Sequence, residues 1–193
     1  MRAARYLTVA ATLSVASAAM TFAPVSVAQE VIPGSTLLNI FGRNNYNAIA
    51  RTTVDFPGNH RPGSIVIRTH ERRLYYVLGD GRALRYGIGV GRDGFRWSGV
   101  HRVSAKKAWP GWTPPAQMLR RRPDLPRYME GGEANPLGAR AIYLGSTLYR
   151  IHGSNEPETI GQAVSSGCFR MTNEDVIDLY DRVGVGAMVT VLR

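Results

Sequence analysis

Short hydrophobic runs separated by glycine and aspartate indicate a chain built mainly from β-strands. Residues 64–68 form a β-branched run, and residues 73–78 and 83–86 lie on either side of the pair Asp80-Gly81. An Asp-Gly pair between two such runs is a strong signal for a β-hairpin. We therefore predict a strand at 64–68 that leads directly into a hairpin.

Further strand patterns follow along the chain. Residues 99–103 and 187–192 each have the pattern of a single strand, and residues 140–144 and 147–152 predict a second hairpin around a Gly-Ser pair. The chain contains 21 glycines and 11 prolines among 193 residues. That composition favours a turn-rich β architecture over a helical bundle.

One helix is predicted near the C-terminal end. Thr172 and Asp175 have the spacing of a capping box, and Gly184 is a natural helix stop. The apolar residues between these signals recur at intervals that place them on one helical face. They are Val176, Leu179, Tyr180 and Val183. The predicted fold is therefore mostly β, with one firm helix.

Residues 105–136 interrupt the strand pattern. This segment contains Trp109, Trp112, a Pro-Pro pair and three consecutive arginines. It is long for a connection inside a compact domain, and loops of this length often cover binding sites. We predict an ordered, lid-like loop, with a floppy insertion as the alternative.

The N-terminus has the pattern of an export signal. Two arginines precede the uncharged, apolar residues 7–20, and small residues at 26–28 fit a signal-peptidase site. An uncleaved anchor is the alternative, but the run is short and rich in alanine for a membrane span. The predicted organisation is a signal peptide at 1–28, an N-terminal extension at 29–61 and a catalytic domain at 62–193.

The chain is strongly basic, with a formal net charge of +10. A basic exported protein suits an anionic envelope polymer, although a merely solvated basic face is the plain alternative. Nucleic acid is disfavoured as a partner by the export signal and by the lack of interleaved aromatic and basic residues. No segment after the signal is long and apolar enough to span a bilayer.

The chain holds a single cysteine, Cys168, which is either buried and inert, paired between chains, or reactive. Gly167 before it allows a substrate to approach closely, and backbone N–H groups of this Gly-Cys pair are candidate oxyanion donors. His152, at the end of a predicted strand, is a candidate base for the thiol. Arg170 is a candidate to bind a substrate carboxylate. From the spacing of Cys168 and His152 alone, an inert buried cysteine is a stronger interpretation than a catalytic one.

The wider pattern resembles the signature of the L,D-transpeptidase catalytic domain, the YkuD family. The resemblance covers about residues 62–193 and includes the segments 62–67, 73–75 and 135–138. Its most specific part is the string His152-Gly153-Ser154-Asn155, Gly161, Ser165-x-Gly167-Cys168-x-Arg170-Met171-x-Asn173-x-Asp175 and Leu179-Tyr180.

The resemblance implies a sandwich-like, mostly β catalytic domain that acts on peptidoglycan. Cys168 would attack the diamino acid carbonyl of a tetrapeptide stem and release the terminal D-Ala. His152 would be the general base, oriented by the carbonyl of Gly153. An acceptor amine would resolve the thioester, giving a 3→3 crosslink or tethering an outer-membrane protein. The family needs no metal or organic cofactor, and carbapenems commonly acylate its cysteine.

Substrate contacts are expected from Arg170, Ser165 and Ser166, with Tyr143 and Trp112 as candidate walls of the cleft. Aromatic residues on strands more often belong to the core, and a loop tryptophan often packs within its loop. Many family members carry His-Gly-Cys where this chain has Ser166, which leaves the choice of acceptor open. The four histidines show no metal-ligand spacing.

Three other functions stay open on the sequence. Water in place of the amine would make the protein an L,D-carboxypeptidase or a crosslink-cleaving amidase. A non-catalytic wall-binding protein would leave Cys168 inert. A redox role is weakened by the absence of a second cysteine. The expected location is the periplasm, in association with the cell wall.

Overall fold

A computed structural model describes residues 49–193 of the chain. The signal peptide predicted at 1–28 and most of the extension predicted at 29–61 lie outside the described residues. Within the described part, neither α-helix is long and apolar enough to cross a bilayer.

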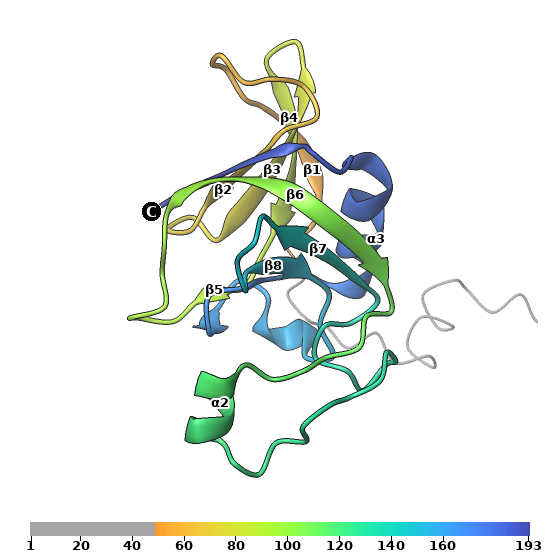
Figure 1. Ribbon diagram of the computed structural model, residues 1–193. Helices are drawn as coiled ribbons and strands as arrows, with labels where there is room; N and C mark the ends of the chain where they lie inside the picture. The colour runs from red at the N-terminus through yellow and green to blue at the C-terminus, as the bar shows by residue number, and fades with distance from the viewer. Residues whose placement is uncertain (1–48) are drawn as a thin grey trace, which may run out of the picture. The chain divides into compact units, whose positions relative to one another are not determined.

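Nine strands form one bent sheet in the order β1-β4-β3-β2-β11-β6-β7-β8-β10 (Figure 1). A separate two-stranded parallel ribbon joins β5 and β9. The bounds of the strands are β1 Thr52–Asp55, β2 Ile65–Arg68, β3 Arg73–Gly79, β4 Arg82–Gly87, β5 Val90–Gly91, β6 Gly99–Ala108, β7 Arg140–Leu144, β8 Arg150–His152, β9 Ala163–Ser165, β10 Phe169–Arg170 and β11 Met188–Leu192.

The first predicted hairpin is confirmed as β3 and β4. Asp80 and Gly81 at its tip have φ angles of 50° and 67°, both in the left-handed region that a tight hairpin turn requires. β1 pairs antiparallel with β4. Since β1 precedes Pro62, the sheet begins before the position at which the sequence pattern placed the start of the domain.

The second predicted hairpin is confirmed as β7 and β8, with a longer turn than expected. Thr147 stabilises this turn, because its hydroxyl donates to the Leu144 carbonyl at 2.7 Å and accepts from the Tyr149 N–H at 3.1 Å. β8 therefore begins only at Arg150. The turn places Leu148 and Tyr149 beside the site described below.

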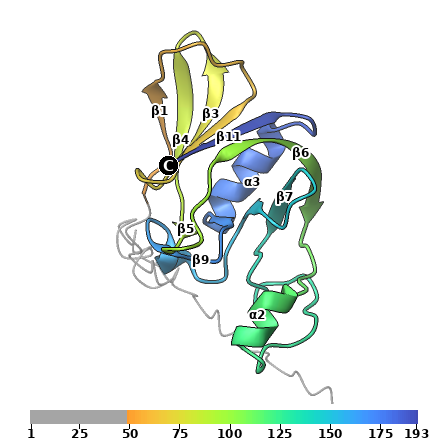
Figure 2. The same ribbon diagram turned by 60° about the vertical axis from the view of Figure 1, so that its left-hand side comes forward.

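The predicted helix is confirmed as α3, Asn173–Arg182, and it packs inside the bend of the sheet (Figure 2). The Thr172 hydroxyl accepts the Asp175 N–H at 3.1 Å, which is one of the two hydrogen bonds expected of the capping box. Val176, Leu179 and Val183 are buried against both halves of the sheet. The core thus lies between two sheet halves and the helix, as the sandwich-like prediction required.

β6 is much longer than predicted because two different strands pair with it. Its first half pairs with β11 and its second half with β7. The register shifts between Val103 and Ala105, and such a bulge bends a sheet. Residues 104–108 lack alternating hydrophobicity, so this strand depends on tertiary pairing rather than on local pattern.

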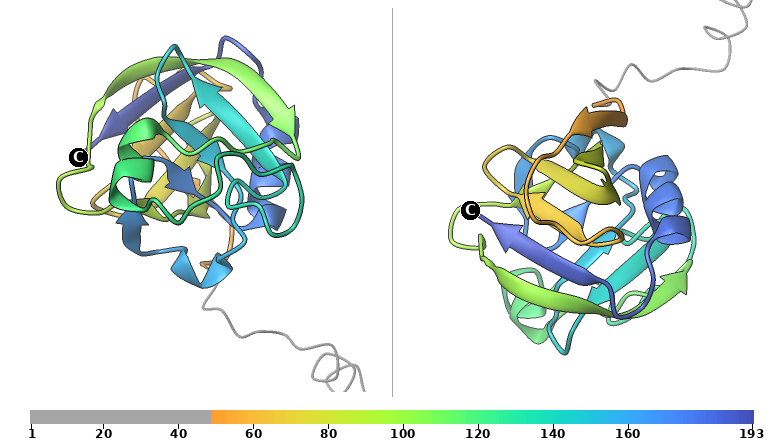
Figure 3. Two further views of the ribbon diagram at one scale, coloured as in Figure 1. Left: turned by 60° about the horizontal axis from the view of Figure 1, so that its bottom comes forward. Right: turned by 90° about the horizontal axis from the view of Figure 1, so that it is seen from above.

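The lid-like loop consequently begins at Trp109 rather than at residue 105. It runs to β7 and contains a short helix, α2, Ala116–Arg121. In the left view of Figure 3, green α2 and its loop cross in front of the strands. The buried Asn135 organises the loop, because its side-chain amide donates to the Pro110, Met129 and Glu130 carbonyls at 3.2, 3.3 and 2.8 Å.

Candidate active site

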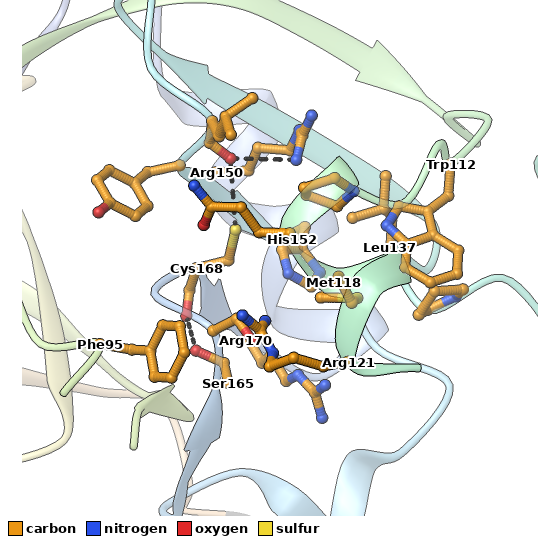
Figure 4. A pocket seen from close by; sticks show the side chains of 16 residues that line it. Phe95, Trp112, Met118, Arg121, Leu137, Arg150, His152, Ser165, Cys168 and Arg170 are labelled. Atoms are coloured by element: carbon orange, nitrogen blue, oxygen red, sulfur yellow. Dashed lines mark hydrogen bonds between the residues drawn. The ribbon is translucent and has the colours of Figure 1, made fainter. Parts of the chain in front are cut away.

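The thiol and the imidazole singled out in the sequence come from adjacent parallel strands. β10 pairs with β8, so that Arg170 lies opposite His152. Cys168 stands just before β10. Both Cys168 and His152 line a pocket of about 330 Å³ beneath the lid-like loop (Figure 4). Strand pairing thus brings together two residues that lie in separate segments of the sequence.

The imidazole of His152 is held in one orientation. Its side chain is buried, and Nδ1 lies 2.6 Å from the carbonyl oxygen of Gly153. A carbonyl can only accept, so Nδ1 carries the proton and Nε2 keeps its lone pair. Burial lowers the pKa of His152 to about 4 against the opposing effect of the Gly153 carbonyl. The ring is therefore neutral near pH 7.

The thiol of Cys168 donates to the carbonyl of Leu148, with Sγ and oxygen 3.7 Å apart. Burial raises the pKa of the Cys168 thiol, and Arg150 and Arg170 act in the opposite direction. The free site therefore holds a neutral thiol and a neutral imidazole, rather than a preformed thiolate–imidazolium pair.

Hydrogen bonds hold the turn at residues 165–168, here called the nucleophile turn after the predicted role of Cys168. Ser165 Oγ donates to the Cys168 carbonyl at 2.6 Å and accepts the Gly167 N–H at 3.2 Å. Trp97 Nε1 donates to the Gly167 carbonyl at 2.8 Å. The predicted oxyanion role of the Gly167 N–H therefore needs correction, because Ser165 occupies that donor. Among residues 49–193, the Cys168 N–H has no hydrogen-bond partner.

Gly167 contributes through its backbone shape and its lack of a side chain. Its φ of 110° lies in a region that L-residues rarely adopt. A Cβ atom at this position would lie 2.6 Å from Cε1 of Tyr149. Trp97 stacks on Tyr149 with ring centroids 4.3 Å apart and an angle of 13°, so a shift of the Tyr149 ring would disturb this stack.

We expect Gly167→Ala to disrupt the nucleophile turn. Strain at φ and the clash with Tyr149 should lower the free energy of unfolding by roughly 2–4 kcal/mol and slow active-site acylation at least tenfold. Denaturant unfolding and acylation rates measure the two effects. Gly184→Ala is the matched control, because a Cβ there meets nothing within 4 Å. Equal behaviour of the two variants would contradict this role of Gly167.

Three arginines line the pocket. Arg170 lines it as predicted, but its Nη1 is paired with Glu156 Oε2 at 2.7 Å. Arg150 also lines the pocket, and so does Arg121 of α2, whose guanidinium lies 5.1 Å from the ring centre of Phe95. These charges make the pocket suited to an anionic substrate.

The lid-like loop supplies much of the apolar lining of the pocket. Trp112 lines it as the sequence predicted. Trp109 does not, and borders a separate cavity together with residues from the start of α3. The remaining apolar lining consists mainly of Phe95, Pro115, Met118, Pro136, Leu137, Leu148 and Tyr149.

The other predicted contacts divide into three cases. Ser166 lines the pocket and is partly exposed. Ser165 also borders it, but its hydroxyl is engaged within the nucleophile turn. Tyr143, a candidate wall of the cleft, is not among the residues that line the pocket, and its ring lies under the guanidinium of Arg150 at 5.3 Å.

Sequence analysis missed Arg150 and Trp97. Arg150 stands two residues before His152 on the same strand, so the period of two would have placed both on one face. Trp97 gave no comparable signal, because its contact with Gly167 spans 70 positions. Residues 49–193 contain no group of three or more His, Cys, Asp or Glu side chains that could hold a metal ion.

Comparison with known proteins identifies a family for this chain. Residues 62–191 match the family model "YkuD: L,D-transpeptidase catalytic domain". The Escherichia coli protein named "Probable L,D-transpeptidase ErfK/SrfK" is 39% identical over 145 residues, which are 70% of this chain and 46% of that protein. The chain thus spans about half the length of this curated relative.

Two solved structures share the fold. L,D-transpeptidase 3 from Mycobacterium tuberculosis has a TM-score of 0.55 at 17% identity, over 67% of this chain and 60% of that one. A Brucella melitensis protein has a TM-score of 0.51 at 47% identity, over 74% and 93%. That protein is described as a "Probable carnitine operon oxidoreductase", a name that differs from the family match.

Proposed function

Because this chain belongs to the L,D-transpeptidase catalytic domain (YkuD) family, we propose that it is a cysteine acyltransferase acting on peptidoglycan tetrapeptide stems. The observation that carries the proposal is the oriented base. The Gly153 carbonyl fixes Nδ1 of His152 as the protonated nitrogen, and the same pocket holds the single cysteine of the chain. A redox role is disfavoured, because these 193 residues contain no second thiol.

The first step is acylation of Cys168. Nε2 of His152 takes the thiol proton, and the sulfur bonds to the carbonyl carbon of the third stem residue, whose C=O electron pair moves to oxygen. Collapse restores the C=O bond and breaks the C–N bond to the terminal D-Ala. The leaving amine takes the proton from His152, and a thioester remains on Cys168.

The second step regenerates the thiol. An acceptor amine attacks the thioester and gives a proton to His152, and Sγ leaves as a thiolate that recovers this proton. The free N–H of Cys168 is the best-placed backbone donor for the oxyanion in both steps, since the Gly167 N–H is engaged by Ser165. This proposal replaces the role first assigned to the Gly167 N–H.

The pocket lining supports an anionic peptide substrate. Arg121, Arg150 and Arg170 provide positive charge toward stem carboxylates, while Trp112 and the apolar lid residues exclude water from the thioester. Ser166 and Trp112 are the proposed peptide contacts among the uncharged residues. The same electrophilic chemistry makes a carbapenem an expected acylating inhibitor.

The acyl acceptor decides between a transpeptidase and a hydrolase. We propose an amine acceptor, either a second stem or an outer-membrane protein, for an enzyme exported to the periplasm through a cleaved segment at 1–28. Water is the alternative acceptor, and it would make the protein an L,D-carboxypeptidase or a crosslink-cleaving amidase.

Product analysis tests the acceptor. The purified protein is incubated with a disaccharide-tetrapeptide, with or without excess free D-amino acid as a small amine acceptor. We expect D-Ala release with a crosslinked dimer in the first case and an exchanged tetrapeptide in the second. Tripeptide as the sole product under both conditions would contradict an amine acceptor and favour hydrolysis.

A further inference from the structure

We infer that Arg150 fixes the position of the Cys168 sulfur through the Leu148 carbonyl and stabilises that sulfur when it becomes a thiolate. The inference takes from the proposed function only that Cys168 reacts as a thiolate.

One carbonyl oxygen links the arginine to the thiol. The Leu148 carbonyl accepts from Arg150 Nη1 at 3.1 Å and from Cys168 Sγ at 3.7 Å (Figure 4). The two donors therefore converge on a single oxygen atom. This arrangement places a fixed positive charge next to the sulfur, and it ties the position of the sulfur to that of the guanidinium.

The guanidinium is held in place but is not neutralised. Its Cζ lies 5.3 Å from the ring centre of Tyr143, the residue opposite Arg150 across β7 and β8. Its Nε is buried without a hydrogen-bond partner in the described part of the chain, where no carboxylate pairs with it either. Such a cation keeps both its charge and spare donors for an anion that forms beside it.

The other basic side chains near the sulfur are less suited to stabilising a thiolate. Arg170 is paired with Glu156 at 2.7 Å. Arg121 lies over Phe95, on the lid side of the pocket. His152 is neutral near pH 7, since burial lowers its pKa to about 4. Arg150 shares a hydrogen-bond acceptor with the thiol and, within residues 49–193, forms no ion pair with a carboxylate.

Arg150 is expected to contact the sulfur once the thiol has lost its proton. When the thiol proton moves to Nε2 of His152, the sulfur no longer donates to the Leu148 carbonyl and is repelled by that oxygen. A guanidinium N–H can then donate to the negative sulfur. Arg150 opposes the desolvation that raises the pKa of the Cys168 thiol.

Alkylation of the single cysteine measures this effect without any peptide. The purified protein reacts with iodoacetamide from pH 6.5 to 10, and intact mass follows the rate. We expect Arg150→Gln to react about 3- to 10-fold more slowly at pH 7.5, with its profile moved to higher pH by about half to one unit. Arg150→Lys keeps a charge and should remain within about twofold of wild type.

Arg140→Gln is the matched control. Arg140 also lies over a tyrosine ring, donates to a backbone carbonyl and has a buried Nε without a partner within residues 49–193, but it does not line the pocket. We expect its alkylation profile to match wild type. Arg150→Met, which keeps the stem over Tyr143, makes the same comparison if Arg150→Gln does not fold.

Two results would overturn the inference: a wild-type alkylation profile in the uncharged Arg150 variants, or Arg150→Lys as slow as Arg150→Gln in equally stable proteins. A different result is expected if the inference about Arg150 holds but the proposed acyltransferase function is wrong. In that case wild type forms no acyl adduct with a tetrapeptide, while the Arg150 variants still differ from it in alkylation.

Discussion

Cys168→Ala should reduce D-Ala release from a tetrapeptide stem to background, a loss of about 10⁴-fold or more. The side chain is small, and its hydrogen bond to the Leu148 carbonyl is long at 3.7 Å. Its removal should therefore leave the fold intact. Melting temperature and binding to isolated peptidoglycan, both measured beside D-Ala release, establish that only the chemistry has been lost.

Cys168→Ser is the control that preserves shape. A serine hydroxyl ionises far less readily than a thiol, and the neutral His152 beside it is a modest base, so this variant should be nearly as inactive as Cys168→Ala. Undiminished D-Ala release by the alanine variant would refute nucleophilic catalysis by Cys168. Unchanged wall binding with no activity in wild type would favour a non-catalytic wall-binding protein.

His152→Asn should slow acylation by about 10²- to 10⁴-fold, because it removes the group that accepts the thiol proton. Asparagine can still donate to the Gly153 carbonyl, so the local backbone should persist. The single-turnover acylation rate gives the direct measurement. His70→Asn is the control, since the His70 side chain is 59% exposed and lies beside Glu71, outside the pocket. Equal rates for the two variants would remove His152 from the mechanism.

The pH dependence follows from the same residue. In the proposed mechanism the neutral imidazole of His152 is the active base, and a pKa of about 4 keeps it neutral above about pH 5. Acylation should therefore lose activity near pH 4 rather than near the ordinary 6.5. A fall of the acylation rate near pH 6.5 instead would show that the imidazole of His152 is not desolvated as the structure indicates.

Stability should respond to pH through the same shift. As pH falls from 6.5 toward 4, the unfolded chain binds a proton at His152 before the folded chain does. The free energy of unfolding should fall across this window, by at most about 1.4 kcal/mol per pH unit from this residue. Denaturant unfolding of wild type and His152→Asn across this range isolates the contribution.

Local pattern predicted the elements that are stabilised locally. The Asp80-Gly81 turn, the second hairpin and the capped helix after Thr172 are formed by neighbouring residues, and all three are confirmed. The second half of β6 could not be predicted, because its pairing partner lies more than 30 positions away on β7. The lid-like loop was expected to be longer for the same reason.

In the candidate site, too, the residues within one sequence segment could be predicted and the contacts between distant segments could not. His152, Cys168 and Arg170 could be found because they belong to a string that resembles the family signature, whereas the spacing of one histidine and one cysteine favoured an inert thiol. The orientation of Tyr143 could not, since a strand aromatic faces either side until the sheet is known. The contact of Trp97 with Gly167 and the shared carbonyl between Arg150 and Cys168 arise only when distant segments pack.

Intact-protein mass spectrometry with a disaccharide-tetrapeptide tests the central claim most directly. We predict a transient adduct on wild type equal to the stem tripeptide unit, mapped by proteolysis to Cys168, with one D-Ala released per adduct. Cys168→Ala should form none, and His152→Asn should form it slowly. Wild-type protein that binds the substrate but forms no adduct on Cys168, with D-Ala still attached to the stem, would contradict the account.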